Sequence, residues 1–276
     1  MSSGRKRTVL AFLIVGATVV GSVGSAGASR SELSLGLQQG LEAGVGTTTS
    51  TNWAGYTITN RKPFTSATGR WVQPAVTCAD LSSTYSAFWV GLGGFSNRSF
   101  AVEQTGTLAN CSSGSPRYSA WYELYPAAPV TLKLAVKPGD LLSATVSVNQ
   151  KTVLIRLKNV TTGRLINKKL RMSRPDTGSA EWVAEAPSGC DSAGNCRILP
   201  LANFGTVAFS HSTANVRGHR GRISDPVWSA TTIELHGDLN DPTSPSQAGA
   251  NAIPGAIGPD GGSFAVTWQQ LTPPTG

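Results

Sequence analysis

The sequence predicts an all-β sandwich or barrel. From Thr51 onward, short segments alternate apolar with polar residues or are rich in β-branched residues, and Gly, Pro, Asn or Ser bound them. No long stretch has the helical period of apolar residues. About 220 residues lie between Thr51 and Gln270, which is enough for one domain with a substantial core. Many short strands separated by turn signals are typical of packed or closed antiparallel sheets.

Seven segments carry the strand pattern most clearly. Between two of them, Asn149-Gln150-Lys151 can turn a hairpin. Asn240 to Gly262 is rich in Pro, Gly, Ser and Ala, and we expect a long loop there before the final strand. The seven predicted strands are 86–91, 118–125, 142–148, 152–160, 179–185, 204–210 and 263–268.

The N-terminal 28 residues have the pattern of an export signal. A basic cluster, Arg5 to Arg7, precedes an apolar run of about twelve residues and the small-x-small sequence Ala26-Gly27-Ala28. The apolar run is shorter than the roughly twenty residues that span a bilayer. We therefore expect cleavage after Ala28 and a secreted, extracellular protein without a membrane anchor. Residues 29–50 are expected to form a short leader or pro-segment, with a disordered tail as the alternative, followed by one domain over 51–270 and a tail over 271–276.

Charge and cysteine content agree with export. Losing the signal removes three basic and no acidic residues, which lowers the formal charge from +8 to +5. The basic residues are scattered, whereas nucleic-acid-binding proteins carry a dense basic stripe, so no nucleic-acid partner is expected. Four cysteines in an exported chain favour two disulfides. Of three pairings we prefer Cys190–Cys196, which closes a small loop of turn-forming residues, and Cys78–Cys111.

The segment Ser119 to Tyr125 predicts a binding face. Because side chains alternate along a strand, Trp121, Glu123 and Tyr125 share one face. A lone Glu on a sheet is more often part of a cross-strand ion pair. Here two aromatic side chains flank it, which favours a cleft.

Two further stretches, Val102–Gly106 and Ser179–Glu185, indicate a hydrolase that uses an amide and a carboxylate. A carboxylate can take a proton from water while an amide N–H stabilises the oxygen on which negative charge grows. Gln104 is the candidate amide, although a buried Gln is more often only a satisfied core residue. Alternation places Glu181 and Glu185 on one face and cannot choose between them. We prefer Glu181, which lies further inside its strand, and keep Glu185 as a supporting residue.

Other catalytic templates lack their motifs. His211, His219 and His236 form no HExxH sequence, no Ser lies in a GxSxG turn, and no CxxC pair supplies zinc-ligand spacing. Neither a metal nor another cofactor is therefore expected.

The ordered motifs resemble the glutamic endopeptidases, or eqolisins, the family of scytalidoglutamic and aspergilloglutamic peptidases. The resemblance covers nearly all of the predicted domain, and the motifs occur in the family's order. They are Thr51-Asn-Trp-Ala-Gly-Tyr56, Ala87-Phe-Trp-Val-Gly-Leu-Gly-Gly94, Gln104-Thr-Gly106, Ala120-Trp-Tyr-Glu-Leu-Tyr-Pro126, Lys137-Pro-Gly-Asp140, Ala180-Glu-Trp-Val-Ala-Glu185 and Pro200-Leu-Ala-Asn-Phe-Gly205.

The resemblance implies a concanavalin-like sandwich of two curved antiparallel sheets and an endopeptidase active in acidic solution. By motif position, Glu181 would be the general base and then the acid, and Gln104 would stabilise the oxyanion. An unperturbed Glu titrates near pH 4.3, which suits acidic solution. One departure is Gly93-Gly94, where the fungal proteins carry an Asp. The residues expected to hold the substrate are Trp53, Trp89, Trp121, Glu123, Tyr125 and Glu185.

Two other functions are consistent with the same residues. A glycoside hydrolase would use Glu123 and Glu181 as paired carboxylates, about 5 Å apart in a retaining enzyme. A carbohydrate- or peptide-binding module would use the aromatic face without activating water. We favour the peptidase, with protein or peptide substrates and a monomeric state.

Overall fold

The computed structural model describes residues 32–34, 42–43, 46–79, 81–191, 195–237 and 250–271, the first two segments as backbone only. The predicted signal peptide, residues 1–28, and residues 272–276 of the predicted tail lie outside the described residues. Within the described ranges, no helix is long and apolar enough to cross a membrane. The same residues form antiparallel sheets, apart from one parallel pair between β3 and β18. The predicted all-β sandwich is therefore confirmed.

The first layer carries the candidate site. Its strands lie in the order β9, β8, β7, β6, β13, β4, β18, β3 and β2. Their bounds are β2 Glu42–Ala43, β3 Thr47–Ser50, β4 Trp53–Thr59, β6 Ala87–Leu92, β7 Val102–Ser112, β8 Ser115–Tyr125, β9 Val130–Leu132, β13 Ser179–Glu185 and β18 Ser229–Leu235.

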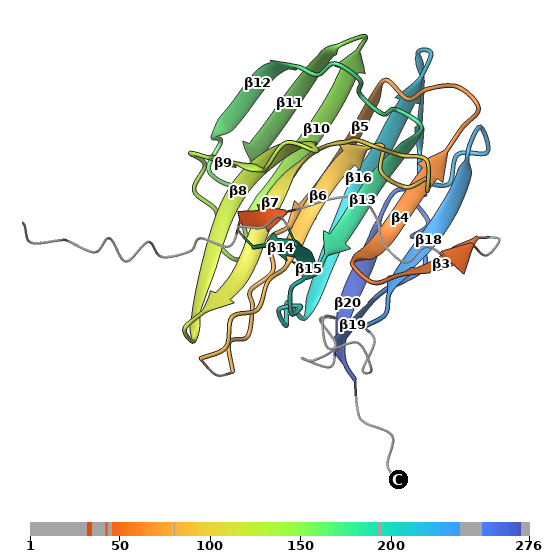
Figure 1. The fold of residues 1–276 in the computed structure, drawn as a ribbon. Coiled ribbons are helices and arrows are strands. Elements are labelled where there is room, and N and C mark those ends of the chain that lie inside the picture. The colour runs from red at the N-terminus through yellow and green to blue at the C-terminus, as the bar shows by residue number, and fades with distance from the viewer. Residues whose placement is uncertain are drawn as a thin grey trace, which may run out of the picture. The chain divides into compact units, whose positions relative to one another are not determined.

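The second layer packs against the first. It runs in the order β12, β11, β10, β5 and β16, and β16 then pairs with both β17 and β20 while β19 pairs with β20. The strands of both layers run in similar directions (Figure 1). The bounds are β5 Ser66–Val72, β10 Leu141–Asn149, β11 Thr152–Asn159, β12 Leu165–Arg171, β16 Thr206–Val216, β17 His219–Arg222, β19 Ala250–Pro254 and β20 Phe264–Gln270.

The main core lies between these layers. Alternation turns one face of each strand inward, as in β11, where every second residue is buried. Two indoles also form hydrogen bonds from one layer to the other. Trp182 Nε1 of β13 donates to the Thr68 carbonyl at 2.8 Å, and Trp71 Nε1 of β5 donates to Thr107 Oγ1 at 3.0 Å. These bonds satisfy buried polar groups and fix the two layers against each other.

Most predicted strands agree with the structure, and one predicted loop is partly wrong. Strand β13 has the predicted bounds, and the predicted hairpin joins β10 and β11 with Gln150 at a φ of 53°. The strand predicted over 204–210 begins two residues later and extends to Val216. The predicted loop over 240–262 contains β19, which pairs with the final strand. A strand of alternating Ala, Asn and Ile ending in Pro gives little apolar signal of its own.

Both predicted disulfides are present, Cys78–Cys111 and Cys190–Cys196. The second closes a small sheet formed by β14 Ser188–Cys190, β15 Cys196–Ile198 and β1 Glu32–Ser34. Parts of the predicted leader thus pair with the domain, since β1 pairs with β14 and β3 pairs with β18.

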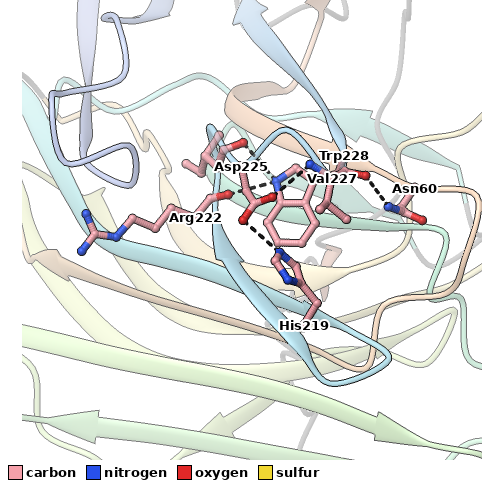
Figure 2. A network of polar contacts seen from close by, with 7 residues as sticks. Asn60, His219, Arg222, Asp225, Val227 and Trp228 are labelled. Atoms are coloured by element: carbon pink, nitrogen blue, oxygen red, sulfur yellow. Dashed lines mark hydrogen bonds and ion pairs between the residues drawn. The ribbon is translucent and has the colours of Figure 1, made fainter.

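A polar network holds the connection between β17 and β18 (Figure 2). His219 Nε2 and Asp225 Oδ2 lie 2.9 Å apart, and the Val227 N–H donates to Asp225 Oδ1 at 2.9 Å. The Val227 N–H, together with His219, lowers the pKa of Asp225 below its usual value. Trp228 Nε1 donates to the Arg222 carbonyl at 2.9 Å. The network fixes the turn from which β18 enters the first layer beside β4.

Candidate active site

One row of residues crosses the first layer on the face that points away from the second. The register pairs Glu181 with Thr57 on one side and Gly91 on the other, Gly91 with Gln104, and Gln104 with Glu123. Residues paired in this way have their side chains on the same face. Glu181 and Gln104 are two strand spacings apart, about 9.5 Å between backbones. Gly91 of β6 places no side chain of its own between the two functional groups.

Only glycine fits at position 91. A Cβ added there would lie 2.9 Å from Trp89 Cζ3, 3.1 Å from Gln104 Cβ and 3.1 Å from the Glu103 carbonyl oxygen. The Trp89 ring therefore lies close against the backbone of Gly91, on the strand between those that carry Glu181 and Gln104. The absence of a side chain at Gly91 thus lets the Trp89 ring and the Gln104 side chain lie close to the backbone of β6.

Glu123 orients the candidate oxyanion donor. Gln104 Nε2 donates to Glu123 Oε2 at 2.7 Å, and both side chains are buried. A hydrogen bond to a carboxylate is stronger than one between neutral groups, so the amide plane is firmly held. Because a primary amide carries two N–H groups, one bond to Glu123 is compatible with a second donation to an oxyanion. Glu123, predicted to contact substrate, lies here as the partner of Gln104.

The Glu181 carboxyl is buried and tends to keep its proton. Its side chain is 0 % exposed, and Thr57 Oγ1 donates to Oε1 at 3.4 Å. Burial raises the pKa of Glu181 well above its ordinary value, hydrogen bonds from Ser179 and Thr57 oppose this rise, and the nearby carboxyls of Asp176 and Glu103 add to it. A raised pKa brings the acid and base forms of Glu181 into balance in less acidic solution.

Three tryptophans line the same face around the row. Trp53 and Trp89 meet edge to face with ring centroids 4.9 Å apart, and Trp121 belongs to the same buried cluster, against which Tyr125 packs. Glu185 is buried and accepts a hydrogen bond from Trp89 Nε1 at 2.7 Å. Glu185 therefore lies level with the aromatic cluster and orients Trp89, whereas Glu181 lies level with Gln104. The register thus places Glu181, and not Glu185, in the row that contains Gln104.

The glycoside hydrolase hypothesis has no geometric support. Glu123 and Glu181 are three strand spacings apart, about 14 Å between backbones. Gln104 lies between them and binds Glu123 directly. Paired carboxylates of a retaining glycosidase need a separation of about 5 Å, and a water-filled gap in an inverting one.

Sequence reasoning missed two acidic residues near the row. Glu103 is fully buried on the opposite face of β7, and its Oε1 accepts the main-chain N–H of Asp176 at 3.0 Å. Burial, the largest cause, raises the pKa of Glu103 to about 9. Neither residue is part of a pattern that identifies it in the sequence.

A surface pocket beside the Cys78–Cys111 disulfide includes no residue of the row.

Comparison with known proteins identifies the family of the chain. The model of the peptidase A4 family matches residues 51–251, which is most of the chain. A comparison with curated protein sequences finds no match. Among solved structures, scytalido-glutamic peptidase with a transition state analog inhibitor superimposes with a TM-score of 0.64 at 20% identity, covering 79% of this chain and 98% of that one. Aspergilloglutamic peptidase from Aspergillus niger gives 0.52 at 23% identity, covering 67% and 99%.

A third solved structure is SCP-B, a member of the eqolisin family in complex with the tripeptide Ala-Ile-His. It superimposes with a TM-score of 0.60 at 19% identity and covers 79% of this chain and 98% of that chain. At these identities the structural likeness supports the fold, while the family match supports the enzyme class. The chain therefore belongs to the peptidase A4 family, the eqolisins, and is a glutamic-type peptidase.

Proposed function

We propose that the protein is a secreted endopeptidase that cleaves peptide bonds of proteins in acidic solution, with Glu181 and Gln104 as its catalytic dyad. The observation that carries this proposal is the row formed by Thr57, Glu181, Gly91, Gln104 and Glu123. It places the Glu181 carboxyl and the Gln104 amide on the same face, with Gly91 between them.

The reaction follows from the chemistry of these two groups. The Glu181 carboxylate takes a proton from water, and the water oxygen bonds to the carbonyl carbon of the peptide. The carbonyl oxygen becomes an oxyanion, which Gln104 stabilises by donating an N–H. The protonated Glu181 then gives its proton to the amide nitrogen, the carbon–nitrogen bond breaks, and the carboxylate is restored. The raised pKa of Glu181 favours this last step because it keeps the acid form available.

We assign substrate binding to the tryptophan cluster. The indole nitrogens of Trp53 and Trp121 are buried, and neither has a hydrogen-bond partner among the described residues. In a cleft such N–H groups can donate to the carbonyl groups of an extended peptide.

The test compares variants of the two dyad residues with a matched surface control. Glu181→Gln should lower kcat by about 10²–10⁴-fold because the base is lost. Gln104→Ala should lower kcat by about 10²–10³-fold because an oxyanion donor is lost. Glu234→Gln, on β18 at a partly exposed surface position, is the matched control and should keep full activity. Cleavage of a denatured protein is followed across acidic and neutral pH. Undiminished proteolysis in either dyad variant removes that residue from the mechanism.

Export is tested separately. The basic and apolar residues of positions 1–28 support signal cleavage after Ala28. Sequencing the N-terminus of protein recovered from the culture medium checks this proposal, and retention of the full-length chain inside cells contradicts it.

A further inference from the structure

The segment before β13 places Asp176 at one end of the catalytic row. The Gly178 N–H donates to Asp176 Oδ1 at 2.9 Å, and Ser99 Oγ donates to Asp176 Oδ2. The main-chain N–H of Asp176 donates to Glu103 Oε1 at 3.0 Å. Asp176 therefore connects the entry of β13 with the loop after β6 and with strand β7.

Gly93 makes room for this side chain. It has a φ of 80°, in the region that favours glycine, and a Cβ added to it would lie 2.7 Å from Asp176 Cβ. The Gly93 N–H also donates to the Ser179 carbonyl at 3.1 Å. Ser179 is the first residue of β13, shares a face with Glu181, and its side chain hydrogen-bonds to Glu181. The contacts of Asp176 thus fix the strand end that carries the catalytic carboxyl.

Asp176 also contributes to the electrostatics of Glu181. Asp176 and Glu103 are the two carboxyls that act on Glu181 by charge. Glu103 has a pKa raised by burial to about 9, so it is neutral in acidic solution. Along the row, Glu123 lies beyond Gln104, and Glu185 lies four residues further along β13 beside Trp89. The neighbouring strands present Thr57, Gly91 and Gln104 to Glu181, none of which carries a charge.

We propose that Asp176 is a positioning residue for Glu181, an inference that rests on the proposed function. It anchors the start of β13 against Gly93, Ser99 and Glu103, and its carboxyl acts on the Glu181 carboxyl by charge. That charge favours the protonated form of Glu181, which is the form that delivers a proton to the leaving amine. Asp176 therefore adds to the larger effect of burial in raising the pH at which the base form of Glu181 appears.

The experiment measures kcat/KM against pH for the full chain and for Asp176→Asn. The variant keeps the size of the side chain and the main-chain bond to Glu103 but loses the charge. Without a nearby negative charge, ionisation of Glu181 becomes easier. The rising limb of the profile should therefore move to lower pH by about half to one unit, with little change in KM.

Two matched variants separate charge from structure. Asp176→Glu retains the charge and should return the limb toward its original position even if kcat falls. Ser99→Ala removes one contact of Asp176 without changing any charge, and its limb should stay in place. Thermal unfolding of each variant reports whether it is folded.

The results distinguish this inference from the proposed function. The inference is overturned if the rising limb of Asp176→Asn lies at the same pH as that of the unmodified protein. It is also overturned if kcat/KM of the variant falls by the same factor at every pH, without a shift of the limb. If Asp176→Asn does not fold, Asp176→Glu provides the test instead. Its longer side chain moves the charge relative to Glu181, so the rising limb of its pH profile must shift from that of the unmodified protein. That shift must be smaller than the shift expected for loss of the charge. Full activity of Glu181→Gln instead overturns the proposed dyad, whatever Asp176 does.

Discussion

The buried Glu103 predicts that the protein loses stability as pH rises. Its side chain is 0 % exposed on the core side of β7 and accepts the Asp176 N–H. Burial raises its pKa from 4.5 to about 9, which outweighs that hydrogen bond. Between these two values the folded chain binds one more proton than the unfolded chain, so the free energy of unfolding falls with rising pH. The stabilising proton is fully present below pH 4.5 and is lost as pH approaches 9.

The magnitude follows from the shift. At about 1.36 kcal/mol per pH unit, the gap between 4.5 and about 9 corresponds to about 6 kcal/mol. This is comparable to the whole stability of many domains, about 5–15 kcal/mol. Glu103→Gln keeps the shape and the acceptor for the Asp176 N–H but cannot ionise. Between pH 4.5 and 9 the difference in stability between the variant and the unmodified protein should therefore grow steadily in favour of the variant.

Denaturant unfolding at a series of pH values measures this difference. Glu181 contributes to the pH dependence of both proteins in the same direction, because burial, the largest cause, also raises its pKa. Glu234→Gln is the surface control and should follow the unmodified protein. Parallel stability curves for Glu103→Gln and the unmodified protein would refute the reasoning.

Three further predictions concern the row and the disulfide. Gly91→Ala should destabilise the fold by about 1–3 kcal/mol and lower kcat, because the added methyl group meets the Trp89 ring. Denaturant unfolding and steady-state kinetics measure the two effects, with Gly255→Ala as the control. Glu123→Gln should lower kcat by about tenfold or more with a smaller change in KM, because the Gln104 amide loses its hydrogen bond to a carboxylate. Unchanged kinetics would contradict the proposal that Glu123 orients Gln104. Replacing both Cys78 and Cys111 by Ser should cost about 2–5 kcal/mol in unfolding experiments, with activity retained at low temperature.

The strand pattern within single segments was sufficient for much of the fold. Alternation correctly placed Trp121, Glu123 and Tyr125 on one face, and it gave β13 its bounds. It failed where a strand carries little apolar signal, as in β19, which pairs with β20 inside a stretch rich in Pro, Gly and Ser. Local patterns report which face a residue occupies because the side-chain period of a strand is two.

The sequence by itself therefore determined the all-β class, the cysteine pairs and a short set of candidate residues. Only the tertiary structure showed how these residues lie relative to one another. Glu181 is level with Gln104, and Glu185 is level with Ala87 and Trp53, because β4, β13, β6 and β7 pair in one register. That register joins strands about eighty residues apart in the sequence and depends on packing across the whole sandwich. For the same reason Asp176 and Glu103 became visible only in the fold, since desolvation and charge coupling depend on distance in space.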